Sequence, residues 1–175
     1  MNEQNFTSAA TSINQTKLPA IFNKQPLADA VRKWTTAAVL DYGCGRYTAH
    51  IEKHVRWLGA EYLPFDPFNQ DQDTNENSRN MAALYRLCGS SVVVTCSNVL
   101  NVIDSDAAVI NVIRDCCELG NAACFTVYEG DRTGNGRQTG PDQYQRNMKL
   151  RSYLPLFEAA GVAAGIQAGM IVAHR

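Results

Sequence analysis

Apolar and polar positions alternate along the chain in blocks that predict strands and helices in turn. Short runs rich in apolar, β-branched and aromatic residues, typical of buried strands, cover 37–41, 61–66, 91–96 and 122–128. Between these runs, apolar residues recur at helical spacing, which predicts helices over 26–34, 47–58, 78–88, 105–120 and 149–160. The last stretch, 162–175, predicts a small terminal hairpin.

Strands that alternate with helices are typical of an α/β fold with a mostly parallel sheet and helices on both faces. Pro64 has no N–H to give to a neighbouring strand, so it favours an edge position for the second strand. The polar stretch 69–80 predicts a loop that runs into the helix of 78–88. We therefore expect no regular strand between 69 and 90.

The length and composition indicate one globular domain. A chain of 175 residues, 45% hydrophobic and 19% charged, suits a single domain over 1–175, with a polar N-terminal segment at 1–17. Sixteen Lys and Arg against seventeen Asp and Glu leave a net charge of −1, which argues against a broad basic surface for nucleic acid. Because no apolar run could span a bilayer or serve as a signal sequence, we expect a cytoplasmic protein without a membrane partner.

Metal binding is not predicted. The six cysteines include no C-x-x-C pair, and they lie mainly in apolar runs as small core residues. His50 and His54 stand four residues apart on a predicted helix, but no third ligand accompanies them. A solvated helix face is the favoured interpretation of this pair.

A glycine turn and a carboxylate follow the first two predicted strands, where open α/β sheets bind their ligands. Gly43 and Gly45 let the backbone turn sharply and approach a ligand closely, and the helix that follows presents free N–H groups. Asp66 ends the second strand at the spacing of a ribose-binding carboxylate. The pair favours a nucleoside-type cofactor over a structural turn. Thr48 replaces the third glycine of the dinucleotide fingerprint, which disfavours a dinucleotide.

At these residues the chain resembles class I S-adenosylmethionine-dependent methyltransferases. LDYGCGRY resembles their first motif and FDP their second. Further segments resemble a small group of methyltransferase-like proteins from bacteriophages and bacteria, including those that accompany DNA phosphorothioation genes; these segments are TKLPA, CSNVLNVI, FTVYEGDRTGNGRQT and DQYQRNMK. The resemblance covers about 12–175. It implies a Rossmann-like class I methyltransferase fold, with S-adenosylmethionine as cofactor, in the cytoplasm of an infected bacterial host. One departure from the family is that only 24 residues separate Asp66 from Ser91, so we expect the usual third strand to be missing or vestigial.

The resemblance also implies which residues bind the cofactor, namely Asp41, Gly43, Cys44, Gly45, Asp66, Pro67, Phe68, Ser97 and Asn98. The glycine turn would line the methionine part, and Asp66 would hold the ribose. Pro67 or Phe68 would lie near the adenine, and Ser97 and Asn98 would face the methyl group.

Asn98 and Glu129 are the candidate catalytic residues. DNA amino-methyltransferases place Pro-Pro-aromatic after the residue that matches Asn98, and Val99-Leu100-Asn101 offers no such platform for a flipped base. Turn or cap hydrogen bonding is the alternative role for Asn98 and Asn101. Glu129 directly follows the fourth predicted strand and would act as a general base or orient the acceptor.

The glycine-rich loop 129–149 is expected to form the acceptor side of the site. Positive charge gathers in and after it, where it would attract an anionic group or simply form a solvated face; the residues are Arg132, Arg137, Arg146, Lys149 and Arg151. The sequence leaves the methyl acceptor open among small molecules, nucleic acids and proteins, and it does not give the oligomeric state.

The leading hypothesis is an S-adenosylmethionine-dependent methyltransferase. The alternative is a cofactor-binding or degenerate methyltransferase-like phage protein that acts by binding a host partner. A third hypothesis is hydrolysis or lyase cleavage of the bound cofactor.

Overall fold

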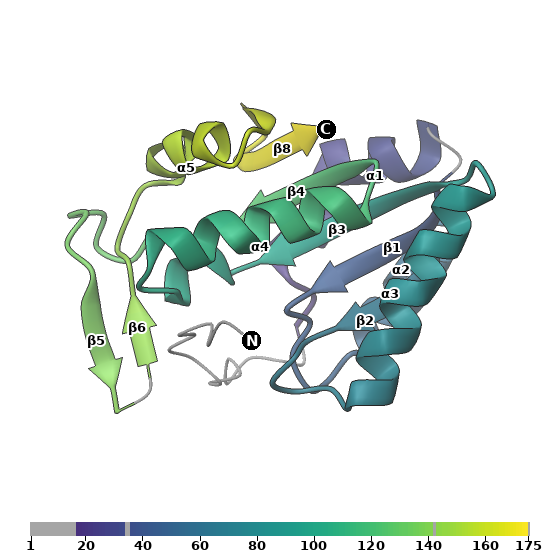
Figure 1. Cartoon of the computed structure of the whole chain (residues 1–175), viewed down its shortest axis with the longest axis horizontal. Helices are drawn as coiled ribbons and strands as arrows, with labels where there is room; N and C mark the ends of the chain where they lie inside the picture. The colour runs from purple at the N-terminus through teal and green to yellow at the C-terminus, as the bar shows by residue number, and fades with distance from the viewer. Residues whose placement is uncertain (1–16, 34–35, 142, 175) are drawn as a thin grey trace.

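The computed structural model describes residues 17–33, 36–141 and 143–174. Within these ranges, one sheet has the strand order β2-β1-β3-β4-β8-β7 (Figure 1). Its strands are β1 Thr36–Tyr42, β2 Glu61–Phe65, β3 Ser91–Ser97, β4 Ala122–Thr126, β7 Ala163–Gln167 and β8 Met170–His174. The first four pair in parallel, whereas β8 pairs antiparallel with β4 and β7. The predicted α/β fold with a C-terminal hairpin is confirmed.

Helices cover both faces of this sheet (Figure 1). One face packs against the 3-10 helix η1 Ala20–Asn23 and the helices α1 Gln25–Lys33 and α2 Ala49–Trp57. The other packs against α3 Gln72–Leu87, α4 Asp106–Leu119 and α5 Leu154–Ala159. Both cores are built from the apolar strand residues that the periodicity identified. Trp34, the last residue of the first predicted helix, lies outside the described residues.

The edge of the sheet agrees with the prediction, but the segment after it does not. β2 is the outer strand, as Pro64 indicated, and residues 67–90 contain no strand. The loop predicted over 69–80 is wrong, because α3 already begins at Gln72. The Asp71 side chain caps this helix by accepting a hydrogen bond from the Thr74 N–H at 2.7 Å. Its first half has few apolar residues, so periodicity failed to reveal it.

The segment 129–160 also contains more structure than the sequence predicted. A small two-stranded sheet, β5 Arg137–Gly140 and β6 Gln143–Gln145, lies beside the main sheet (Figure 1). We call 137–145 the hairpin. The helix predicted over 149–160 is divided into the 3-10 helix η3 Leu150–Tyr153 and α5, with Pro155 in the first turn of α5. Proline has no N–H to lose there, which explains the division.

Two features are absent from the described residues. None of their helices combines the length and the apolar character needed to cross a membrane. No group of three or more His, Cys, Asp or Glu residues among them is placed to hold a metal ion.

Candidate functional site

A cavity of about 690 Å³ opens at the carboxyl ends of β1, β2 and β3. Parallel strands bring their carboxyl ends to one edge, so the segments that follow them meet there. The cavity brings together all nine residues that the resemblance assigned to a cofactor, namely Asp41, Gly43, Cys44, Gly45, Asp66, Pro67, Phe68, Ser97 and Asn98. We call it the strand-end cavity.

The glycine turn needs glycine for both conformation and space. Gly43 and Gly45 have φ angles of 78° and 75°, in the left-handed region that disfavours other residues. A Cβ atom at Gly43 would lie 2.3 Å from Cγ2 of Val99, in the segment after β3. The Gly43 N–H donates to the Phe65 carbonyl oxygen at 2.7 Å. The turn is therefore held tightly between its two neighbouring segments.

The Asp66 carboxylate joins the glycine turn to the turn after β2. Its Oδ1 accepts hydrogen bonds from the N–H groups of Phe68 and Asn69 at 2.9 and 3.1 Å. Its Oδ2 accepts from the Gly45 N–H at 2.9 Å and from Nδ2 of Asn69 at 3.1 Å. These four bonds fill the usual acceptor capacity of a carboxylate. A ribose hydroxyl would have to replace one of them, and the Asn69 side chain is the partner that moves most easily.

Asp41 is a buried carboxyl group behind the glycine turn. Its oxygens accept hydrogen bonds from the Thr95 hydroxyl at 2.8 Å and the Tyr62 hydroxyl at 3.1 Å. Burial raises the pKa of Asp41 to about 6, against the two hydrogen bonds, which lower it. The Asp66 charge raises the pKa further. A cation bound in the cavity would favour the ionised form of Asp41.

The segment after β3 forms the opposite wall. Asn98 is exposed and has a φ angle of 58°, which asparagine tolerates better than most residues. Its N–H donates to the Thr126 carbonyl oxygen at 2.8 Å. Asn101 is buried, and its side chain bonds to Gln145 and to the Tyr128 N–H. Asn101 thus serves hydrogen bonding within the fold.

The sequence analysis missed several residues of this cavity. Its lining includes Lys17, Tyr47, His50 and Tyr128. The rings of Tyr47 and Tyr128 are 65% and 63% exposed, and with Phe68 they give the cavity an aromatic rim. Tyr47 and Tyr128 follow the glycine turn and β4, so their positions after strands were the available signal.

The interpretation of His50 and His54 as a solvated helix face is wrong. In both side chains Nε2 is buried and has no hydrogen-bond partner among the described residues. The His54 ring packs between Phe22 and Trp57, with ring centroids 6.2 and 5.8 Å away. The His50 side chain instead lines the strand-end cavity.

Glu129 is not among the residues that line the strand-end cavity. Its Oε1 accepts the Leu150 N–H at 2.7 Å, and its Oε2 pairs with Nε of Arg132 at 2.7 Å. The first contact holds the loop to the start of η3, and the second lies within the loop. An acid–base role for Glu129 stays a prediction, and these contacts favour a role in which it orients the loop.

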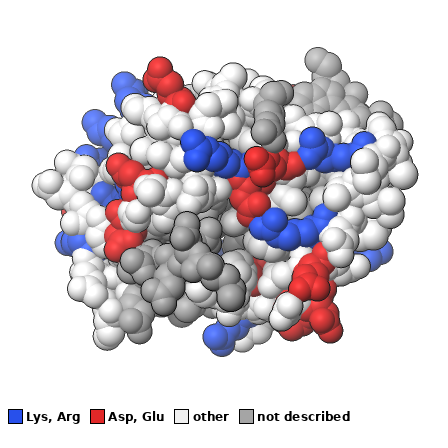
Figure 2. Space-filling view, in the orientation of Figure 1, with Lys and Arg blue, Asp and Glu red and all other residues white. Residues whose placement is uncertain are grey.

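The basic residues after β4 do not form one cluster. Arg146 is buried, where it pairs with Asp106 at 2.6 Å and donates to the carbonyls of Ile103 and Asp104. It serves the fold and is closed to a ligand. Arg137 lines a second cavity, which lies under the hairpin. Figure 2 shows basic and acidic side chains close to one another across the face that it presents.

Comparison with known proteins agrees with the fold. No family model and no curated protein matches the chain. Among solved structures, it resembles the 1,6-didemethyltoxoflavin-N1-methyltransferase of Burkholderia thailandensis, solved with 1,6-didemethyltoxoflavin and S-adenosylhomocysteine. The TM-score is 0.53 at 17% identity, over 86% of this chain and 77% of that one. The chain therefore has the fold of a class I methyltransferase.

Proposed function

We propose that the protein is an S-adenosylmethionine-dependent methyltransferase and that the strand-end cavity binds the cofactor. The observation that carries this proposal is the bond from the Gly45 N–H to Asp66, which couples a glycine turn to a carboxylate at the cavity floor. The similar Burkholderia enzyme is a methyltransferase solved with S-adenosylhomocysteine, which supports the same cofactor here.

The side chains of the cavity fit the chemistry of this cofactor. Asp41 offers a carboxylate to its ammonium and sulfonium charges, while Lys17 and the free nitrogen of His50 offer partners to its carboxylate. Phe68 offers an exposed ring to the adenine. A volume of about 690 Å³ lies within the range of small-molecule sites.

Ribose binding would proceed by an exchange at Asp66. The Asn69 side chain amide occupies the Oδ2 position that a ribose hydroxyl needs. When Asn69 turns outward, the hydroxyl takes its place, and the three backbone N–H groups keep the carboxylate oriented. The exchange replaces the Asn69 bond to Asp66 by a bond from the hydroxyl, and it also releases Nε of Arg46, which donates to Oδ1 of Asn69 at 3.1 Å on the surface, where water can take its place.

When bound, S-adenosylmethionine supplies an electrophilic methyl carbon, whose bond to sulfur breaks as the acceptor's lone pair forms a new bond to it. The protein's main contribution to such an in-line displacement is orientation. Ser97 and Asn98 would line the path of the methyl group. The Ser97 hydroxyl lies 3.0 Å from that of Thr126, which fixes it across β3 and β4. An acceptor proton would pass to Glu129 if the loop released it, and otherwise to solvent.

Calorimetric titration with S-adenosylhomocysteine tests the cofactor site. We expect saturable binding to the wild type and no binding to the double variant that combines Asp41→Asn with Gly43→Val. The surface variant Asp71→Asn is the control and should bind normally. Absence of binding to the folded wild type would contradict the proposal.

Incubation with methyl-labelled cofactor then tests turnover against small molecules, nucleic acids and proteins. Transfer of label to an acceptor with release of S-adenosylhomocysteine supports methyl transfer. Binding without turnover on any acceptor would favour the alternative, a protein that acts by binding a host partner. Cleavage of the cofactor without an acceptor would indicate hydrolysis or lyase chemistry.

A further inference from the structure

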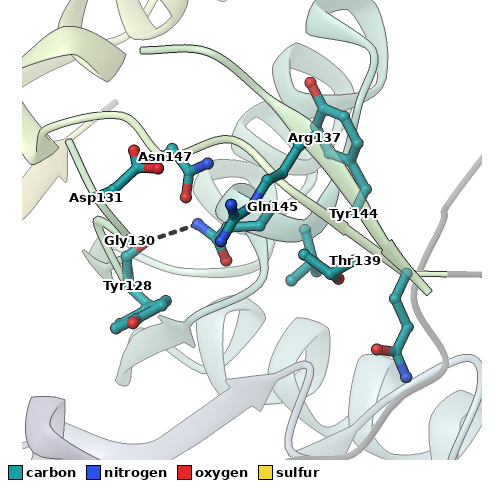
Figure 3. Close-up of a pocket in the computed structure, with 10 residues that line it drawn as sticks. Tyr128, Gly130, Asp131, Arg137, Thr139, Tyr144, Gln145 and Asn147 are labelled. Atoms are coloured by element: carbon teal, nitrogen blue, oxygen red, sulfur yellow. Dashed lines mark hydrogen bonds between the residues drawn. The ribbon is translucent and has the colours of Figure 1, made fainter. Parts of the chain in front are cut away.

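The second cavity adjoins the strand-end cavity. It has a volume of about 540 Å³ and lies between the hairpin and the segment 128–131 (Figure 3). Val102 and Tyr128 line both cavities. We call this second cavity the hairpin cavity. A molecule in it would lie next to a molecule in the strand-end cavity, as a methyl acceptor must lie next to its donor.

Hydrogen bonds within the protein hold the walls of the hairpin cavity in place. Gln145 bridges two segments, since its Nε2 donates to the Tyr128 carbonyl at 2.9 Å and its Oε1 accepts from Nδ2 of Asn101 at 3.1 Å (Figure 3). Asn147 is buried and donates from Nδ2 to the Asn135 carbonyl at 3.0 Å. These amides are engaged, so they shape the cavity and leave recognition to other groups.

Arg137 and Tyr128 offer a ligand the positive charge and an exposed aromatic ring of the lining. Arg137 is exposed and forms no salt bridge with any residue in the described ranges, and Figure 3 shows it reaching from β5 toward Gly130. Asp131, the acid in the lining, accepts hydrogen bonds from the hydroxyl and N–H of Thr133 at 2.7 and 3.0 Å, which lower its pKa. The Arg137 charge lowers this pKa further, although the two side chains form no salt bridge. The ring of Tyr128, between the two cavities, is 63% exposed.

These groups point to one class of ligand. A guanidinium that forms no salt bridge with the described residues binds carboxylates and phosphates through charge-assisted hydrogen bonds. An exposed tyrosine ring favours a planar aromatic partner. A volume of about 540 Å³ suits a small molecule.

We propose that the hairpin cavity is the methyl-acceptor site and that it takes a small planar aromatic molecule bearing an anionic group. The inference rests on the proposed methyltransferase function. Arg137 would bind the anionic group, and Tyr128 would stack on the ring and hold it beside the strand-end cavity.

Nuclear magnetic resonance titration of ¹⁵N-labelled protein tests this assignment in the presence of S-adenosylhomocysteine. The probes are 4-hydroxybenzoate, phenyl phosphate and the neutral 4-hydroxybenzamide. We expect at least one anion to shift the amides of 128–131 and of the hairpin, with about tenfold tighter binding than the neutral amide. The tighter of the two anions identifies the acidic group that Arg137 prefers.

Variants show whether the named side chains are responsible. Arg137→Gln should reduce the affinity for the anion to that for the neutral amide, whereas Arg151→Gln, an exposed charge outside the cavity, should leave it unchanged. Tyr128→Leu should weaken binding about fivefold, and Tyr128→Phe should retain it.

Three results would overturn the assignment. These are equal binding of the anions and the neutral amide, an unchanged affinity for the anion in Arg137→Gln, and no shift of the hairpin amides at 10 mM probe, roughly the weak limit for fragments. The separate titration with S-adenosylhomocysteine distinguishes the two proposals. If it binds and the anions do not, the acceptor site alone is wrong. If the anions bind and S-adenosylhomocysteine does not, the hairpin cavity binds aromatic anions but is not a methyl-acceptor site, and the proposed function fails.

Discussion

Replacing Asp66 by asparagine tests the network that joins the glycine turn to the end of β2. The carboxylate accepts three backbone N–H groups and one side-chain amide. Asparagine keeps one acceptor oxygen but has an NH₂ group in place of the other, and this group faces the donors that the second oxygen had bound. If the oxygen retains Phe68 and Asn69, the Gly45 N–H loses its acceptor and faces a donor.

The magnitude follows from these bonds. An N–H left without a partner in the interior costs about 1–3 kcal/mol, and each of the two retained bonds weakens by roughly 0.5–1 kcal/mol when the charge is removed. Asp66 is only 5% exposed, so water compensates little. We expect Asp66→Asn to lower the free energy of unfolding by about 2–5 kcal/mol, measured by urea denaturation at pH 7.

Asp71→Asn is the matched control, because Asp71 is an exposed helix cap and asparagine caps equally well. Its unfolding free energy should change by less than about 0.5 kcal/mol. A change equally small in Asp66→Asn would refute the network.

Asn69→Ala should bind S-adenosylhomocysteine at least as well as the wild type, since the ribose no longer displaces an amide. Loss of binding in Asn69→Ala would refute the exchange at Asp66.

Three further predictions concern the rest of the site. Because burial raises the pKa of Asp41 to about 6 from 3.8, the native state keeps this proton longer than the unfolded chain. The corresponding stability is present below about pH 4 and is lost toward pH 6, by about 3 kcal/mol. Denaturation across pH 4–7 should show this loss in the wild type but not in Asp41→Asn, and equal slopes would contradict it. Glu129→Gln should change kcat by less than about tenfold if the residue orients the loop, whereas a fall of about 10²–10⁴-fold at unchanged KM would indicate a base. Gly43→Ala should destabilise by about 2–4 kcal/mol, through positive φ and the clash with Val99. Gly59→Ala, also at positive φ but with no atom within 4 Å of its Cβ, should cost about 1–2 kcal/mol, and equal costs would exclude the clash.

The sheet and the floor of the site could be predicted because strong local signals specify them. Buried strands need apolar side chains on both faces, so runs such as 91–96 are visible in the sequence alone. The glycine turn and Asp66 lie directly after such strands, and the parallel topology of the sheet brings the segments after neighbouring strands together. Pro64 identified the edge because it cannot donate to another strand.

The rim of the site could not be predicted in the same way. The hairpin is polar and exposed, so it has no apolar pattern to reveal it. His50 and Tyr128 reach the cavity because of how α2 and the end of β4 are placed on the sheet, which depends on contacts far apart in sequence. Arg146 and Arg137 have similar surroundings in the sequence, yet one is buried against Asp106 and the other lines a cavity.

The polar residues at the start of α3, which prevented its prediction from the sequence, form hydrogen bonds to the edge of the sheet. Among the described residues, no strand pairs with the outer edge of β2, so the polar groups at and after this edge need other partners, and α3 supplies them. The Ser78 hydroxyl donates to the Pro64 carbonyl at 2.6 Å. Asn75 accepts the Asp66 N–H at 2.8 Å and donates back to its carbonyl at 3.1 Å. Serine and asparagine on the inner side of the helix thus take the place of a neighbouring strand and hold the backbone of Asp66 from behind. The Asp66 carboxylate in turn holds the glycine turn. The same polar residues of α3 therefore stabilise the edge of the shortened sheet and orient the proposed cofactor site.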